Sequence, residues 1–357
     1  MKRKKIFVMN VGSASTKVAY YEDESCITDK NIIHPLEEIQ MFGDVMNQKD
    51  YRKKSVSDFM KENNLDVDDM DVVVSRGGHT KPLKSGAYRI NNIMLDQIDS
   101  GSYGRHACDL GASIAFALCK NRKGIPMVVD TPVTDEFDPI AKLSGHPLFP
   151  RQCRFHALSH KATARLYSND IGEKYEELNL ISIHMGGGIT LASHRKGLMV
   201  DGNNGIEGEG PYSTNRSGGL MAQYLINLCF DGKYTKTEIS RMINGNGGLV
   251  AHLGESDVLT VQKMGETDPH AKLVLEGMLY QTCKEAGALA VVLYGNVDAI
   301  LITGGIAHGE KLMEYMKNRL EWIAPVIVYP GENEMKSLAL GALEALKFPD
   351  LLYEMEE

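Results

Sequence analysis

Short apolar runs separated by amphipathic segments dominate the pattern along this chain. The runs are rich in β-branched residues, end in glycine or a polar residue, and lie at 6–9, 71–74, 127–130, 181–184, 300–303 and 326–329. Between them, apolar positions in 105–119 fall on one helical face, and a longer helix is predicted over 272–293, before Gly295. Strands that alternate with helices predict an α/β protein whose ligand sites lie at the strand ends.

Two segments of the chain resemble each other. Residues 8–16 (Val-Met-Asn-Val-Gly-Ser-Ala-Ser-Thr) align with 182–190 (Ser-Ile-His-Met-Gly-Gly-Gly-Ile-Thr). In both, an apolar strand enters a turn of small residues, and alternating apolar positions follow. An internal repeat of this kind predicts two domains of similar design that face each other across a cleft.

Length and composition agree with two domains. The 357 residues are 43% apolar and 24% charged, as is typical of soluble globular proteins. The segment 144–151, with one glycine and two prolines, has the most boundary-like composition. We therefore expect domains over 1–150 and 151–335, with a C-terminal helix over 336–357 that packs back onto the first domain.

Charge and cysteine usage narrow the class of protein. The net charge of −8 does not suggest a nucleic-acid partner, and the basic run 2–5 is short. The apolar run 6–9 is too short for a secretory signal, and no stretch approaches the length of a membrane helix. The six cysteines form no Cys-x-x-Cys pair, so reduced cysteines in a cytoplasmic protein fit better than disulfides or a zinc site.

The first small-residue turn, 10–17, carries groups that bind phosphate. Gly12 lets the backbone approach a ligand closely. Ser13 and Ser15 add hydroxyl donors, and Lys17 adds a positive charge. In a P-loop such a turn opens a helix, whereas here the following residues alternate like a strand. The pattern predicts a phosphate-binding β-hairpin, with a plain tight hairpin as the alternative.

Two further glycine turns follow predicted strands. They contain His184, Gly186, Gly187 and Gly188 in one case and Gly304, Gly305 and Ile306 in the other. A single glycine pair is a weak signal because sharp turns need glycine anyway. Three strand-to-glycine turns spread over both halves indicate a nucleotide-binding cleft.

An ordered series of motifs runs along the chain. It comprises Asn10-x-Gly-Ser-x-Ser-x-Lys17, Arg76-Gly-Gly-His79, Asp130-Thr-Pro132, Phe155-His-Ala-Leu-Ser-His160, His184-x-Gly-x-Gly188, Asn203-Asn204 with Glu207-Gly-Glu-Gly-Pro211, Arg216-Ser-Gly218, Thr303-Gly-Gly305 and Glu332-Asn-Glu-Met335. These motifs resemble the acetate and butyrate kinase family of the actin-like ATPases, and the resemblance covers nearly all of the chain. The second glycine turn and the segment 207–211 are in the style of the butyrate kinases. The resemblance implies two similar actin-like (ribonuclease H-like) domains that flank a nucleotide cleft.

The resemblance also implies roles for individual residues. Arg76 and Arg216 match two arginines that bracket the acyl carboxylate and the transferring phosphoryl group. Asp130 matches a carboxylate that orients the catalytic arginine. His160 matches a histidine that contacts the phosphoryl oxygens, and His184 opens the second phosphate turn.

Metal and nucleotide contacts follow from the same resemblance. Asn10 and Glu334 match groups around a magnesium ion, which usually keeps several waters. Glu332 lies close enough in sequence that a small shift of alignment would exchange it with Glu334. The strip Gly304, Gly305 and Ile306 is expected to pack on adenosine.

The expected substrate pocket contains Arg76, Gly77, Gly78 and His106. Acetate kinases commonly carry two valines where this chain has Gly77 and Gly78. We hypothesise that losing those side chains opens room for a longer acyl tail, so that butyrate or a branched acid such as isobutyrate is the expected acceptor.

The implied reaction is the reversible, direct transfer of the γ-phosphoryl group of ATP to a short-chain carboxylate. A fatty acid, with a pKa of roughly 4.3–5, is already ionised at neutral pH and needs no general base. Arginines and magnesium then hold two anions in line. Relatives are generally dimers or larger, so a homo-oligomer is expected.

Several alternatives stay open at this stage. One alternative is a kinase of the same family whose acceptor is acetate or propionate. Another is a different actin-like ATPase, such as a sugar kinase with Asp130 as its base. A nucleotide-binding regulator without catalysis is a third class. Locally, Arg76 and Arg216 could form surface ion pairs, and the i,i+4 pair His156 and His160 has a spacing that zinc accepts, though no third ligand is obvious.

Overall fold

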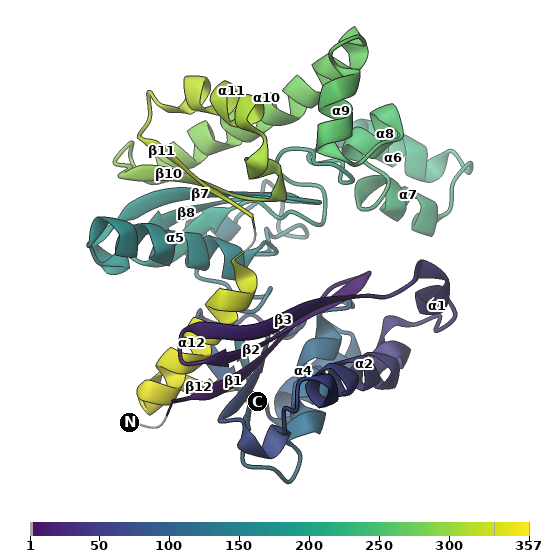
Figure 1. Ribbon diagram of the computed structural model, residues 1–357. Helices are drawn as coiled ribbons and strands as arrows, with labels where there is room; N and C mark the ends of the chain where they lie inside the picture. The colour runs from purple at the N-terminus through teal and green to yellow at the C-terminus, as the bar shows by residue number, and fades with distance from the viewer. Residues whose placement is uncertain (1–2, 332, 357) are drawn as a thin grey trace. The chain divides into compact units, whose positions relative to one another are not determined.

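The computed structural model describes residues 3–331 and 333–356. The chain forms two compact units, each with its own sheet (Figure 1). The first unit comprises Met1–Asp135 and Asn333–Glu357, and the second comprises Glu136–Glu332. The sequence analysis expected domains over 1–150 and 151–335. In the structure the junction comes earlier, after Asp135, and the second unit ends earlier, at Glu332.

A small apolar cluster explains why residues after Asp135 belong to the second unit. Phe137 and Ala141 pack there against Phe155, Ala192 and Met199. This packing, and not the glycine and prolines of 144–151, determines where the first unit ends. The junction therefore falls ahead of that cluster.

The strands of the first unit pair in the order β12-β5-β6-β4-β1-β2-β3. Their bounds are β1 (Lys5–Val11), β2 (Ser15–Glu22), β3 (Ser25–Ile33), β4 (Val72–Ser75), β5 (Ala87–Arg89), β6 (Ile125–Val129) and β12 (Leu352–Glu354). β1 is antiparallel to β2, with Val11 opposite Thr16, and parallel to β4. Helix α12 covers one face of this sheet, and α2 and α4 cover the other (Figure 1). Residues 6–9 of β1, which lie in a sheet covered on both faces, are all apolar and buried.

Along the chain, most helices of the first unit connect its strands. They are α1 (Leu36–Gln40), α2 (Lys49–Glu62), α3 (Asn92–Ser100), α4 (Asp109–Cys119) and α12 (Glu334–Lys347), with 3-10 turns η1 (Val45–Gln48), η2 (Val67–Asp69) and η6 (Pro349–Leu351). The helix expected over 336–357 ends at Lys347. The residues after it form η6 and then β12, which pairs with β5, so that part of the expectation is corrected.

The strands of the second unit pair in the order β11-β10-β7-β8-β9. Their bounds are β7 (Asn179–Met185), β8 (Ile189–Arg195), β9 (Leu198–Gly202), β10 (Ala299–Gly304) and β11 (Val326–Pro330). This order reproduces β6-β4-β1-β2-β3 of the first unit, with the same antiparallel hairpins and parallel neighbours. The predicted α/β class with two similar actin-like sheets is confirmed.

Helices cover both faces of the second sheet. The helices of the second unit are α5 (Ala157–Ile171), α6 (Ala222–Phe230), α7 (Lys236–Ile243), α8 (Gly248–Leu253), α9 (Val258–Met264), α10 (Pro269–Val292) and α11 (Glu310–Leu320), with η3 (Pro139–Lys142), η4 (Tyr175–Glu177) and η5 (Gly305–His308). Of these, α5, α10 and α11 pack on the sheet. Ile181 and Ile183 share a core with α10 and α11, whereas Leu180 packs with α5 on the opposite face (Figure 1). This arrangement fits the alternation of side chains along a strand.

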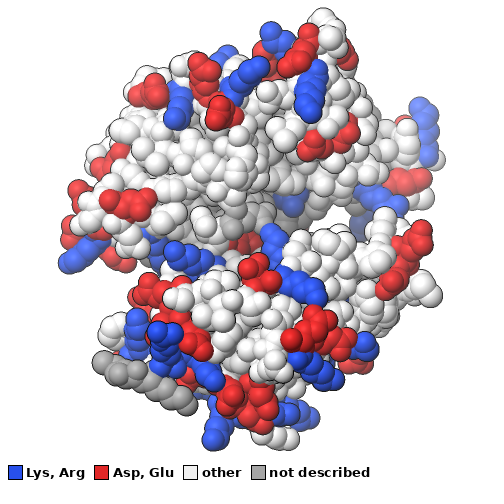
Figure 2. All heavy atoms as spheres, in the orientation of Figure 1, with Lys and Arg blue, Asp and Glu red and all other residues white. Residues whose placement is uncertain are grey.

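The surface agrees with a weakly acidic protein. Figure 2 shows lysines and arginines interspersed with acidic side chains over the visible face. Among the described residues, no helix combines the length and apolar character that crossing a membrane would require.

Candidate active site

The first small-residue turn is the β-hairpin that the sequence predicts. It joins β1 to β2, and the Gly12 amide donates to the Ser15 carbonyl over 2.9 Å. Asn10 and Lys17 pair across the two strands at the base of the turn. The turn therefore leads into a strand, whereas the turn of a P-loop leads into a helix.

Three predicted site residues of the first unit lie together. The Asn10 side-chain amide donates to the Glu334 carboxylate, and Arg76 Nη1 lies 3.7 Å from Glu334 Oε1. Glu334 is only 6% exposed and opens helix α12. A carboxylate beside an amide is the kind of oxygen-rich donor set that magnesium accepts, so these residues fit the metal that the resemblance implies. Glu332 lies outside the described residues.

The predicted extra room beside Arg76 is not present. Gly77 has φ +81, and a Cβ there would lie 2.8 Å from Thr131 Cγ2. A Cβ on Gly78 would lie 2.6 Å from Asp109 Oδ1 and 2.7 Å from its Cα. The space of the two missing side chains is thus already filled by neighbouring atoms. The glycines allow close packing, and the hypothesis that they leave a wider acyl pocket is corrected.

Replacing Gly78 with alanine is expected to lower the stability of the protein and its activity on every acid tested. The added methyl group meets the backbone of Asp109, so overpacking should cost about 1–3 kcal/mol and lower the Tm by several degrees. Thermal unfolding and kinetics over a series of acids measure this. Gly145→Ala, at a position with no atom within 4 Å, is the control. An unchanged Tm with a new preference for acetate would revive the pocket hypothesis.

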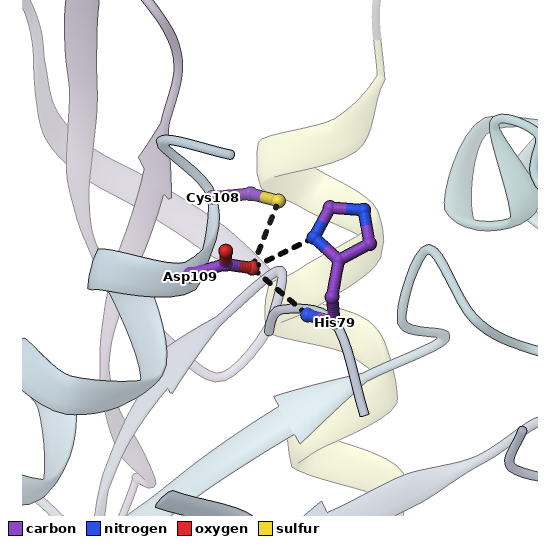
Figure 3. A group of neighbouring side chains, drawn as sticks. All are labelled: His79, Cys108 and Asp109. Carbon is purple, nitrogen blue, oxygen red and sulfur yellow. Dashed lines mark hydrogen bonds and ion pairs between the residues drawn. The ribbon is translucent and has the colours of Figure 1, made fainter. Parts of the chain in front are cut away.

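Asp109 organises the segment beside Arg76, and the sequence reasoning missed it. Its Oδ1 accepts from the backbone amide of His79 at 2.8 Å and from Nδ1 of the same residue at 2.9 Å (Figure 3). Its Oδ2 accepts from the His106 amide at 2.7 Å. These contacts fix the position of the His79 ring and of the His106 backbone. No sequence signal marked Asp109, because an acidic residue in a first helical turn is ordinary.

The neighbouring side chains of His79, Cys108 and Asp109 do not form a promising metal site. His79, Cys108 and Asp109 place one potential ligand atom each within 4.8 Å of one another (Figure 3). Burial raises the pKa of the Cys108 thiol to about 12, which keeps it protonated at neutral pH. The Nδ1 atom of His79 is also engaged by Asp109. These three side chains therefore form a hydrogen-bonded group that supports the segment beside Arg76.

Two further predicted residues of the first unit are placed as follows. His106 Nε2 lies 3.3 Å from Ser13 Oγ, so an expected pocket residue adjoins the expected phosphate hairpin. Asp130 is buried, has φ 42, and accepts from Ser85 Oγ at 2.6 Å and the Gly86 amide at 2.9 Å. Its role toward the catalytic arginine stays a prediction.

Arg216 lies against the glycine turn of the second unit. A Cβ on Gly188 would lie 2.0 Å from Arg216 Nη1 and 2.4 Å from Cζ. Arg216 Nη1 also donates to the Gly205 carbonyl at 2.6 Å. The absence of a side chain on Gly188 thus lets the guanidinium lie close to this turn. Within the turn the Gly186 amide donates to the Gly188 carbonyl.

One cavity joins two of the predicted glycine turns. It has a volume of about 610 Å³ and is lined by Gly186 and Gly187 from one turn and Gly305 and Ile306 from the other. Further lining residues, which the sequence reasoning missed, are Thr214, Asn215, Ser256, Asp257, Val258, Leu259, His308, Gly309 and Leu312. Parallel strands β7 and β10 bring the turns together, because both turns follow the same edge of the sheet.

His160 lies deeper than its predicted role suggests. It is fully buried, its Nδ1 lies 2.6 Å from Ser182 Oγ, and its Nε2 lies 2.9 Å from Thr190 Oγ1. Burial holds its pKa well below the ordinary value, so the ring is neutral. Both ring nitrogens are engaged by hydroxyl groups. Direct contact with a phosphoryl group would require breaking one of these bonds, and the predicted role remains without support here.

His156, four residues earlier, is only partly buried, whereas His160 is fully buried. Its ring stacks on His184 with centroids 4.1 Å apart, and its Nδ1 lies 2.8 Å from Thr190 Oγ1. Thr190 therefore links His156 to the buried His160. The sequence analysis gave His156 no role toward the phosphoryl group and named it only with His160, as a pair whose spacing zinc accepts.

Comparison with known proteins places the chain. A family model described as the acetokinase family matches residues 145–326. Butyrate kinase 1 of Clostridium acetobutylicum is 42% identical over 344 residues, which cover 96% of this chain and 97% of that protein. A probable butyrate kinase of Clostridium botulinum is 41% identical over 343 residues, with 96% and 97% covered.

A solved structure supports the fold. The acetate kinase of Porphyromonas gingivalis superposes with a TM-score of 0.78 at 18% identity, covering 97% of this chain and 100% of that one. At this identity the likeness concerns the fold alone. The sequence matches extend over nearly the whole chain at more than 40% identity. This chain belongs to the acetokinase family.

Proposed function

We propose that this protein reversibly transfers the γ-phosphoryl group of ATP to a short-chain carboxylate, with butyrate as the acceptor. The products are an acyl phosphate and ADP. The carrying observation is the guanidinium of Arg216, which lies on the Gly188 turn beside the 610 Å³ cavity. Two relatives named as a butyrate kinase and a probable butyrate kinase, each more than 40% identical over 96% of the chain, favour butyrate.

The cavity of the second unit suits the nucleotide. Glycines at Gly186, Gly187 and Gly305 leave the backbone accessible to a ligand, and Ile306 and Leu259 add apolar surface on which a purine ring can pack. Asn215 adds a polar group for orientation. We assign ATP to this cavity.

Asn10 and Glu334 would hold magnesium. The carboxylate and the amide lie in contact, and hard cations prefer such oxygens and retain water. When bound, the ion supplies neutralisation of charge on phosphate oxygens. Arg76, 3.7 Å from Glu334, then presents a permanently charged, forked donor that suits a carboxylate.

No proton acceptor is needed for this reaction. The acid arrives ionised, so the protein has only to position two anions and stabilise the charge of the transition state. The neutral, buried His160 is consistent with a supporting position behind His156. We assign the contact with phosphoryl oxygens to His156, and direct in-line transfer needs no covalent phosphoenzyme.

A panel of acids tests the proposal. The protein with ATP and magnesium is offered acetate, propionate, butyrate, isobutyrate and valerate, and acyl phosphate is trapped with hydroxylamine. One buried methylene contributes about 0.8 kcal/mol, or roughly fourfold in kcat/KM, so a graded profile with its maximum at butyrate or isobutyrate is expected.

The negative outcomes separate the alternatives. A maximum at acetate would sink butyrate as the substrate but keep the carboxylate kinase. No trapped acyl phosphate with any acid, together with ADP release stimulated by hexoses, would favour a sugar kinase. Neither activity would favour a nucleotide-binding regulator. A homo-oligomeric cytoplasmic enzyme is part of the proposal, and light scattering on purified protein measures its assembly.

A further inference from the structure

Arg52 is a fully buried arginine that donates hydrogen bonds to the turn of the β1–β2 hairpin, the turn that the sequence predicts to bind phosphate. It projects from α2, and its Nη1 donates to the carbonyls of Gly12 at 2.9 Å and Ser15 at 3.1 Å. Its Nη2 donates to the Ser13 carbonyl at 2.7 Å. Gln48 Oε1 accepts from Nε at 3.0 Å and from Nη2 at 2.9 Å. The planar fork of donors therefore matches the curve of the turn.

The charge of Arg52 is not paired with a carboxylate among the described residues. All its hydrogen-bond acceptors there, including Thr16 Oγ1 at 3.3 Å, are neutral oxygens. Burial lowers the pKa of Arg52, yet a guanidinium stays charged in proteins. An unpaired buried cation is costly to stability. Its place directly behind a turn of glycine and serines suggests that an anion on the other side of the turn offsets this cost.

The hydrogen bonds also set the direction of the turn's peptide groups. The carbonyls of Gly12, Ser13 and Ser15 are directed to Arg52, and the Ala14 carbonyl accepts from the His34 amide at 2.9 Å. In a planar trans peptide the N–H points opposite to the C=O of the same unit.

The amides of Ser13 and Ala14, which share peptide units with the Gly12 and Ser13 carbonyls, therefore face away from Arg52. No hydrogen bond donated by the Ser13 or Ala14 amide is found within the part of the chain that the structure describes. Successive amides that converge in this way make a concave anion site. The hairpin thus has a donor face directed outward and an acceptor face held by one guanidinium.

We propose that Arg52 is a positioning residue that turns the hairpin amides toward a phosphate group of ATP and adds a buried positive charge behind them. This inference rests on the proposed function and extends it to a residue outside the motifs of the family resemblance. Arg52 does not touch the nucleotide. It acts through the backbone of 12–15.

Lysine cannot replace this arrangement. A lysine ammonium carries the same charge on a single nitrogen, whereas Arg52 reaches acceptors on both sides through two separate nitrogens. Arg52→Lys keeps a cation but loses the fork. Gln48→Met keeps the guanidinium and removes the acceptor that orients it.

The test is direct binding of magnesium–ATP and of adenosine, measured by calorimetry without any acid present. For Arg52→Lys we expect ATP affinity to fall about tenfold or more, with adenosine affinity within twofold of the unaltered protein, because only ATP carries phosphates. Gln48→Met should show the same selective loss, but smaller. Lys54→Ala, an exposed position on the same helix paired with Asp58, is the control and should bind both ligands normally.

Two results would overturn the proposal. One is unchanged ATP affinity in Arg52→Lys, and the other is an equal loss of ATP and adenosine binding, which would indicate a structural role only. Gln48→Met decides in the same way if Arg52→Lys does not fold. Absence of acyl-phosphate formation in the acid panel would count against the proposed acceptor and leave this test intact, because no acid is present. Failure of the unaltered protein to bind ATP would instead remove the proposed function.

Discussion

Replacing Arg216 with alanine is expected to lower kcat at least about a hundredfold in a protein that remains folded. The guanidinium lies on the Gly188 turn, where a charge that stays fixed can stabilise the transferring phosphoryl group. Removing one preorganised electrostatic donor typically costs two to three orders of magnitude in kcat, hence the estimate of about a hundredfold or more. Steady-state rates of acyl-phosphate formation, with circular dichroism as the measure of folding, test this.

The matched control is Arg319→Ala in the same unit. Arg319 is exposed on α11 and stacks on the Tyr315 ring at 3.7 Å, so its removal changes net charge equally without touching the glycine turn. It should retain kcat within a factor of about two, since exposed substitutions have small effects. Arg216→Lys should lie between the two, because lysine keeps the charge but not the forked donor. Near-normal turnover in a folded Arg216→Ala variant would contradict the assignment of this residue.

Replacing Gly188 with alanine is expected to reduce kcat nearly as much as removing Arg216. The new methyl carbon would lie 2.0 Å from Nη1 and 2.4 Å from Cζ of Arg216, closer than any real contact. The obstructing atoms belong to the end of a flexible side chain, so the arginine moves and the backbone does not. The Tm should therefore change little while kcat falls. Paired measurements of kcat and Tm separate these effects.

Gly287→Ala is the control for the chemistry of the substitution. Gly287 lies within α10 with no atom within 4 Å of its would-be Cβ, and alanine favours a helix over glycine by about 1 kcal/mol. That variant should be as active as the unaltered protein and as stable or more so. The double variant Gly188→Ala with Arg216→Ala should lose no more than Arg216→Ala alone, because both act through one contact. Additive losses, or full activity of Gly188→Ala, would show that the position of the guanidinium does not limit the rate.

The sequence predicted the fold well because its signals are local. Runs such as 6–9 and 181–184 are strands in the structure, and the turn at Gly12 is a hairpin, since alternation and small-residue turns restrict the backbone directly. The repeat between 8–16 and 182–190 anticipated two sheets with the same strand order. The ordered motifs led to the family that the comparisons show.

The site was predicted in part. Asn10 and Glu334, which the resemblance assigns to one metal ion, lie in contact, and Arg76 lies beside Glu334. The turns at Gly186 and Gly305 line one cavity. The roles of these residues stay predictions. The two glycine turns carry a signal in the sequence, because turns at the ends of parallel strands converge on one edge of a sheet. The other three residues were assigned through the resemblance alone.

Other features depended on neighbours that are distant in the chain. Gly77 and Gly78 are filled by Thr131 and Asp109, and His160 is enclosed by hydroxyl groups of β7 and β8. A sequence shows that a side chain is missing or polar, but whether space or a hydrogen bond results is decided by which atoms fold against it.

The chain by itself therefore determined its secondary structure, its duplication and its family, since short-range periodicity and motif order encode these. Only the tertiary structure decided which polar groups line a cavity and which are buried against the backbone. Arg52 illustrates the difference: in sequence it is one cation of an ordinary helix, and in space it is buried against four residues of a turn some forty positions earlier. The physical reason is that the direction of a hydrogen bond and the cost of burying a charge depend on three-dimensional surroundings, which no local pattern specifies.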